Sequence, residues 1–227
     1  MSERSLKRKL FSMLKTHALA DILAELGSHP PRDGIHTLFS GICSAAEKVR
    51  WHAISAMGVN VARLADQDME AARVVMRRLI WSMNDESGGI GWGAPEAMAE
   101  IISNHNALAE EYIHMPISYM REDGNFQEHP IQQRGVAWAV GRLAQTRLDM
   151  VLTKNPVQYL LPYLESADPT VRGFAAWAAG NLKAQPANKF LGKLLADDTI
   201  IRLYENGEIR QIPVQELAQN ALDQINS

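Results

Sequence analysis

A helical segment that recurs along the chain at a nearly constant interval is the feature that most restricts the possible folds. Its clearest copy is Asp168–Leu182, DPTVRGFAAWAAGNL. Asp168 is a good helix-capping residue, and Pro169 suits the first helical position, where a backbone N–H is not needed. Small and apolar residues follow about one helical turn apart, which favours close packing against a neighbouring helix. The segment is therefore predicted to be a helix within a tightly packed helical array.

The same pattern returns when the sequence is shifted back by 39 residues, to Pro130–Gly141. Three pairs of residues coincide under this shift: Pro130 with Pro169, Trp138 with Trp177, and Gly141 with Gly180. A further copy lies at Val49–Gly58, and looser copies lie at Pro95–Ile102 and Val214–Leu222. A helix that recurs every 39 to 44 residues is typical of a protein built from stacked repeats.

Each copy follows an amphipathic segment that can supply a second helix to the repeat. These segments are Leu38–Cys43, Ala71–Met83, Tyr112–Met120, Asn155–Glu165 and Lys189–Leu195. Over residues 31–225, the order of an Asp-Pro start, a Val-Arg pair, an alanine run and a glycine resembles the HEAT repeat, especially the short HEAT-like form first noticed in phycobilisome lyases. The resemblance implies an all-α fold, a right-handed α-α superhelix (solenoid) of about five repeats. We expect residues 1–30 to form an N-terminal helical cap and residues 31–227 to form one continuous solenoid domain.

The last repeat departs from this pattern at about residues 200–212. Asn206-Gly207 is a strong signal for a tight turn, and strand-forming residues such as Ile201, Leu203 and Ile209 flank it. A two-stranded hairpin is marginally stable by itself in water, so it must pack on the solenoid or on a partner. We predict a small β-hairpin inserted in the last repeat, with both alternatives open.

Composition and charge narrow the class of protein. With 46% apolar and 22% charged residues, no bilayer-spanning apolar run and no signal-peptide pattern, the chain reads as an ordinary cytoplasmic protein without a membrane partner. The single cysteine, Cys43, lies on an apolar segment and is expected to be a buried, reduced thiol. A net charge of −3 disfavours nucleic acid as a partner, because affinity for phosphate comes largely from lysine and arginine.

The most unusual stretch is residues 81–96, WSMNDESGGIGWGAPE, in which four glycines lie within six residues. Glycines permit positive φ angles and close approach of a bound group, and a helix beginning at Pro95 directs free N–H groups toward the loop. The candidate partner- or ligand-binding residues are Asn84, Asp85, Glu86, Gly89, Gly91, Trp92 and Glu96, together with Arg50. The structural alternative is a long irregular turn in which Trp92 fills the groove between repeats.

Arg50 and Arg172 occupy equivalent positions in two repeats, where HEAT repeats commonly carry an arginine. One interpretation is a ladder of Asp–Arg contacts between adjacent repeats. The other is a basic concave surface that binds a ligand. Both remain open from the sequence.

The resemblance predicts an architecture and leaves the activity open, because proteins with such repeats include scaffolds and enzymes. Di-iron hydroxylases of this type carry His-Glu pairs at the starts of inner helices, and this sequence has no His-Glu dipeptide. We expect a non-enzymatic scaffold or adaptor that binds a protein partner through the concave face and loop 84–96, with no catalytic residue, metal or cofactor. The alternative is an enzyme or small-ligand binder, similar to bilin lyases or HEAT-like DNA glycosylases, with a pocket at that loop.

Overall fold

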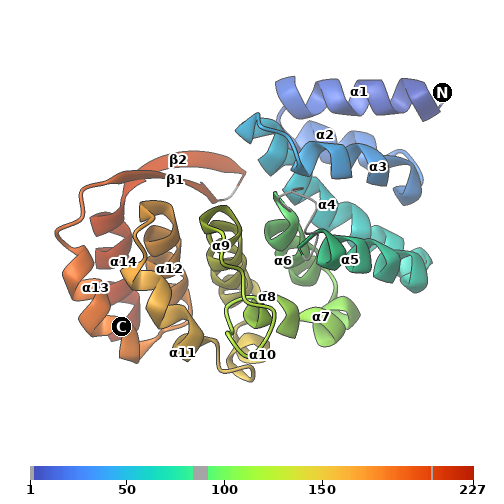
Figure 1. The fold of residues 1–227 in the computed structure, drawn as a ribbon. Helices are drawn as coiled ribbons and strands as arrows, with labels where there is room; N and C mark the ends of the chain where they lie inside the picture. Colours follow the sequence, from blue (N-terminus) through green and yellow to red (C-terminus); the bar gives the residue numbers. More distant parts are fainter. Residues whose placement is uncertain (1–2, 84–91, 206) are drawn as a thin grey trace. The chain divides into compact units, whose positions relative to one another are not determined.

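The chain folds into helices with one small β-hairpin, as seen in a computed structural model that describes residues 3–83, 92–205 and 207–227. Contacts between residues divide it into two compact units, Met1–Ala109 (unit 1) and Glu110–Ser227 (unit 2). The expected all-α class is confirmed (Figure 1). The helices of the expected N-terminal cap belong to the same compact unit as the first repeats. A single continuous domain over residues 31–227 stays a prediction.

Four of the five predicted copies of the repeated helix lie wholly within helices, and the copy Asp168–Leu182 consists of one helix with its two capping residues. Unit 1 contains α1 (Glu3–Thr16), α2 (Leu19–Gly27), α3 (Pro31–Ile42), α4 (Glu47–Gln67), α5 (Met69–Met83) and α6 (Ala94–Asn104), and α7 (Asn106–Tyr112) spans the boundary. Unit 2 contains α8 (His114–Ser118), α9 (Pro130–Thr146), α10 (Leu148–Leu152), α11 (Pro156–Leu160), η1 (Leu161–Glu165), α12 (Pro169–Asn181), η2 (Gln185–Ala187), α13 (Asn188–Leu194), β1 (Ile200–Glu205), β2 (Glu208–Pro213) and α14 (Val214–Asn226). We call α4, α6, α9, α12 and α14 the repeat helices, because they contain the recurring pattern.

The start of α12 forms as its sequence predicts. The Asp168 side chain accepts hydrogen bonds from the backbone N–H groups of Thr170 and Val171, at 2.9 and 3.1 Å. Pro169 occupies the first helical turn, where its missing N–H leaves no bond unmade. The predicted cap is confirmed.

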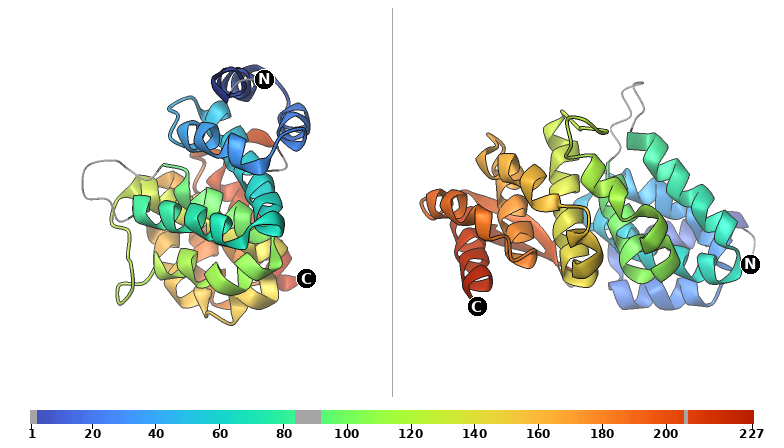
Figure 2. Two further views of the ribbon diagram at one scale, coloured as in Figure 1. Left: turned by 90° about the vertical axis from the view of Figure 1, so that its right-hand side faces the viewer. Right: turned by 90° about the horizontal axis from the view of Figure 1, so that it is seen from below.

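Repeat helices within each unit pack directly on one another: α4 packs on α6, α9 on α12, and α12 on α14 (Figures 1 and 2). Gly141 of α9 lies against the Trp177 ring of α12, and a methyl group there would also meet the Ala178 Cα at 3.3 Å. The Trp138 and Trp177 rings stack with their centroids 6.1 Å apart, and both are almost fully buried. The expectation that small residues allow close approach is confirmed, and both tryptophans pack in the core.

The hairpin packs on the chain's own repeat helices. Strands β1 and β2 pair antiparallel, with Ile201 opposite Ile212 and Glu205 opposite Glu208. Ile201 lies on Gly173 of α12, where an added Cβ would come within 2.5 Å of its Cδ1 atom. The Trp138 indole N–H of α9 donates to the Tyr204 backbone oxygen at 2.9 Å. The predicted hairpin is confirmed and covers one face of α9 and α12, although Asn206 of the predicted turn lies outside the described residues.

Ion pairs between arginine and aspartate link successive segments of unit 2. Arg172 Nε lies 2.6 Å from Asp197 Oδ2, and Arg134 Nε lies 3.1 Å from both oxygens of Asp168. The ladder expected at Arg172 is confirmed. Arg50 instead donates to the Ser44 backbone oxygen at 2.9 Å.

Cys43 is exposed, so its expected burial is wrong. It follows the last residue of α3 as the C-cap. The apolar helical pattern that predicted burial ends one residue earlier, at Ile42.

Replacing Gly141 with alanine should lower the free energy of unfolding by about 1–3 kcal/mol, because the new methyl group would collide with the Trp177 ring and the α12 backbone. The matched control is Gly192→Ala in α13, where no atom lies within 4 Å of the added carbon. That change should stabilise the chain by about 0.5–1 kcal/mol through helix propensity. Urea unfolding of both variants measures the difference, and equal stability would contradict this account of helix packing.

Candidate functional site

The site predicted from the sequence falls partly outside the described residues. The undescribed members are Asn84, Asp85, Glu86, Gly89 and Gly91. The remaining three, Arg50, Trp92 and Glu96, belong to α4, the turn before α6, and α6 itself in unit 1. We call these three residues the Trp92 cluster.

The Trp92 cluster joins a cation, an aromatic ring and a carboxyl group. The guanidinium carbon of Arg50 lies 5.6 Å from the centroid of the Trp92 ring, within the range of a cation–π contact. The Arg50 charge also acts on the Glu96 carboxyl group. The structure thus brings together residues that lie 46 positions apart in the sequence.

Gly93 positions Trp92 beside α6. Its φ angle is 72°, in the left-handed region that favours glycine, and it is the residue that precedes α6. A Cβ atom at this position would lie 2.8 Å from the Ile42 backbone oxygen of α3. Both the conformation and the close approach therefore require glycine, and they place the turn against α3.

Glu96 is the titratable group of this cluster with the most altered environment. Burial raises the pKa of its carboxyl group from 4.5 to about 7, against the opposing effects of its own backbone N–H and of the Arg50 charge. Its Oε2 atom is buried and has no hydrogen-bond partner among the described residues. At neutral pH such a carboxyl group can donate or accept a proton, which suits it to recognition or to acid–base chemistry.

A second site, in unit 2, lies beside the hairpin and is lined by α9, α12 and α14. It is a groove of about 330 Å³. Four amide side chains line it together with Trp177: Gln145 of α9, Asn181 of α12, and Asn220 and Gln224 of α14. We call it the amide groove.

The polar groups of the amide groove are only partly used within the chain. Gln145 donates to a Glu205 carboxylate oxygen at 3.0 Å, and Asn181 donates to the Gly141 backbone oxygen at 3.2 Å. The exposed side chains of Asn220 and Gln224 make no hydrogen bond within the described part of the chain. The groove therefore offers unpaired amide donors and acceptors next to an aromatic ring.

Sequence reasoning missed the amide groove, although a signal was present. Asn181 and Gln224 are 43 residues apart, the same interval that relates Val171 to Val214. Polar residues at a shared repeat position, next to apolar ones, mark the edge of a packed face. The hairpin residues of the groove, Leu203 and Glu205, could not have been placed there from the repeat pattern.

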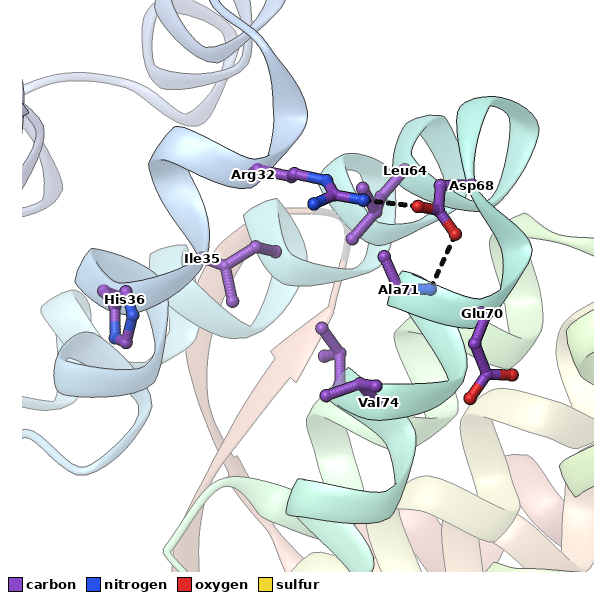
Figure 3. A pocket seen from close by; sticks show the side chains of 9 residues that line it. Arg32, Ile35, His36, Leu64, Asp68, Glu70, Ala71 and Val74 are labelled. Carbon is purple, nitrogen blue, oxygen red and sulfur yellow. Dashed lines mark hydrogen bonds and ion pairs between the residues drawn. The ribbon is translucent and has the colours of Figure 1, made fainter.

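A third hollow lies between α3 and α5 in unit 1, with a volume of about 440 Å³. Figure 3 shows Arg32 paired with Asp68 at one side, while the other Asp68 oxygen accepts from the Ala71 backbone N–H at 2.9 Å. Ile35 and Val74 supply an apolar wall, and Val74 is 52% exposed. This hollow offers contact area for an apolar group, because its charged residues are already paired.

Two properties of the described residues bear on partners. Within residues 3–83, 92–205 and 207–227, no helix combines the length and the apolar character needed to cross a membrane. In the same residues, no three or more His, Cys, Asp and Glu side chains are grouped as a metal site.

Comparison with known protein families finds no match. A curated protein of Archaeoglobus fulgidus, named only as an uncharacterized protein, is 26% identical over 150 residues, which is 65% of this chain and 76% of that protein. This similarity supports relatedness over the shared region and says nothing of activity.

Solved structures of designed armadillo repeat proteins have a similar fold. One, in complex with the peptide (KR)4, is 20% identical, covers 98% of this chain and 92% of its own, and has a TM-score of 0.58. Another, described as designed for modular peptide recognition, is 20% identical with a TM-score of 0.54, over 98% of this chain and 93% of its own. An engineered protein matches with a TM-score of 0.59 at 17% identity, over 96% of this chain and 90% of its own. The chain therefore has an armadillo-type repeat fold, and the phycobilisome-lyase subfamily stays a prediction.

Replacing Glu96 with glutamine should change how stability depends on pH. The folded pKa of about 7 lies above the ordinary value of 4.5, so the carboxyl group favours folding only while it is protonated. That contribution is complete below the ordinary pKa and is lost as pH rises toward about 7. The free energy of unfolding of Glu96→Gln, relative to that of the parent chain, should thus rise by up to roughly 3 kcal/mol across this pH range.

Denaturant unfolding at several pH values measures this difference. The control is Glu216→Gln on the exposed surface of α14, which should follow the parent chain. A Glu96→Gln difference that stays constant from acid to neutral pH would contradict the burial assigned to this carboxyl group.

Proposed function

We propose that this chain is a non-enzymatic scaffold that binds an extended segment of a protein partner. The observation that supports the proposal most directly is the amide groove, where unpaired amide groups from a repeat helix face open space beside Trp177. The Trp92 cluster and the adjoining loop, residues 84–96, are proposed as a second contact surface. A cytoplasmic location stays a prediction.

Amide side chains suit the recognition of an extended backbone. An asparagine or glutamine side chain both donates and accepts hydrogen bonds, so it can pair with the N–H and C=O groups of one peptide unit. Asn181 and Gln224 stand at corresponding positions of α12 and α14, each three residues after the alanine that contacts the glycine of the preceding repeat helix, and corresponding positions recur along a peptide bound across them. Backbone recognition of this kind provides affinity, and neighbouring pockets provide selectivity.

The charges of the amide groove favour a basic segment. Asp223 and Glu205 line it, against the single cation Arg210, whose Nη1 atom lies 3.8 Å from a Glu205 oxygen. The lining therefore has a net negative charge. The likeness to an armadillo repeat structure that holds the peptide (KR)4 agrees with a basic ligand.

A second candidate function is small-ligand binding or acid–base chemistry at Glu96, favoured by its buried, unpaired Oε2 atom. A thermal-shift screen of small anions, amines and sugars would test it. A compound that stabilises the parent chain but stabilises neither Glu96→Gln nor Trp92→Ala would support this candidate. A screen without such a compound would favour the scaffold.

The scaffold proposal predicts that Asn220→Ala weakens binding of a basic peptide by about 3- to 10-fold, the effect of losing one hydrogen bond. The probe is a fluorescent octapeptide of alternating lysine and arginine, measured by anisotropy at low salt. The matched control is Gln215→Ala, an exposed amide of the same helix outside the groove, which should bind like the parent chain. Absence of peptide binding, or equal binding by Asn220→Ala, would contradict the assigned groove.

A further inference from the structure

Unit 2 contains another pocket, away from the hairpin, that neither the repeat pattern nor the proposed function uses. It has a volume of about 500 Å³ and lies between the turn after α8, the start of α9, and the α11–η1 segment. Its lining includes Glu122, Phe126, Gln133, Gln158, Tyr159 and Tyr163. We call it the Tyr163 pocket.

The turn that closes the Tyr163 pocket is held by a set of hydrogen bonds. The Asn125 N–H donates to the Ser118 backbone oxygen at 3.0 Å, and the Gln127 N–H donates to the Tyr119 oxygen at 3.1 Å. The Gln133 side chain of α9 donates to the Gln127 backbone oxygen at 3.0 Å. The wall is thus formed before any ligand binds, which reduces the ordering cost of binding.

The aromatic wall of this pocket already holds a guanidinium group from the chain itself. The Arg121 guanidinium carbon lies 5.4 Å from the centroid of the Tyr159 ring. Two of its nitrogens donate to the two Asp123 carboxylate oxygens, at 3.0 and 2.8 Å. Arg121 and Asp123 neutralise each other, and Phe126 and Tyr163 add two more rings to the lining.

The unpaired polar groups named here can all accept a hydrogen bond. The Tyr163 side chain is 5% exposed, and its buried hydroxyl has no partner among the described residues. Gln133 uses its amide nitrogen on Gln127, which leaves its carbonyl oxygen available. Glu122 adds an exposed carboxylate at the rim that pairs with no other described residue.

A ligand for this pocket needs N–H donors, a positive charge and a flat surface that can lie against aromatic rings. A guanidinium group has all three, whereas an ammonium group lacks the flat surface. We propose that the Tyr163 pocket binds an arginine-type guanidinium group, stacked on the ring wall and donating to Tyr163, Gln133 and Glu122. The proposal depends on the pocket alone and does not require the amide groove to bind a peptide.

The guanidinium group can belong to a protein partner or to a free small molecule. N-acetyl-arginine methylamide represents an arginine within a chain, and free arginine represents the small molecule. The carboxylate of Glu122 would repel the carboxylate of free arginine, which the capped compound lacks. Tighter binding of the capped compound therefore identifies a protein-borne arginine, and tighter binding of free arginine identifies a metabolite; both outcomes support the guanidinium site.

Binding is measured on the full chain by NMR or calorimetry, with a dissociation constant in the millimolar range expected for one such group. Tyr163→Phe keeps the ring and removes the hydroxyl, so it should weaken binding about 3- to 10-fold. Glu122→Gln should weaken it about 2- to 5-fold, as an exposed ion pair does. The control is Glu128→Gln, an exposed carboxylate of the same turn outside the lining, which should leave affinity unchanged.

Guanidinium binding in the Tyr163 pocket can be tested separately from peptide binding in the amide groove. Asn220→Ala should not change binding of the capped arginine, because its side chain lines the other groove. N-acetyl-lysine methylamide should bind several-fold more weakly than the arginine compound. The proposal is overturned if neither arginine compound binds detectably, if their affinity equals that of the lysine compound, or if a Tyr163→Phe variant binds as the parent chain does.

Discussion

Close contact between repeat helices is the constraint on which the rest of unit 2 depends. Gly141 leaves room for the Trp177 ring, and the ring stacks on Trp138 with centroids 6.1 Å apart. The position of Trp138 then directs its indole N–H to the Tyr204 backbone oxygen of the hairpin. The absence of a side chain at Gly141 therefore allows the helix contact, the aromatic stack and the attachment of the hairpin.

This packing decides where unit 2 can offer a binding surface. α12 packs against α9, α14, η1 and the hairpin, so its residues from Gly173 to Gly180 are buried. Open polar groups remain at the edge of the hairpin, in the amide groove, and at the turn after α8, in the Tyr163 pocket. In a repeat fold, surfaces that extend over several repeats can serve recognition, which is the basis of the proposed scaffold role.

Charged residues have two kinds of role in this chain. Asp168 caps α12 and binds Arg134. Burial alone would raise the pKa of its carboxyl group. The hydrogen bonds from Arg134 and from the helix N–H groups outweigh burial and keep this pKa below its ordinary value. The Glu96 Oε2 atom has no hydrogen-bond partner among the described residues, and burial raises the pKa of this carboxyl group to about 7. Asp168 thus supports the fold through its bonds, whereas burial disfavours the charged form of Glu96.

The sequence by itself determined the repeat interval, the Asp168 cap, the repeat helices and the hairpin, because each depends on residues near one another in the chain. It also indicated that Arg50, Trp92 and Glu96 belong to one site. Only the tertiary structure decided the raised pKa of Glu96, the exposure of Cys43, and the two sites of unit 2. The physical reason is that burial and pocket shape depend on side chains from distant segments, such as Tyr163 beside Phe126 or Leu203 beside Asn181, and helical periodicity contains no information on which segments meet.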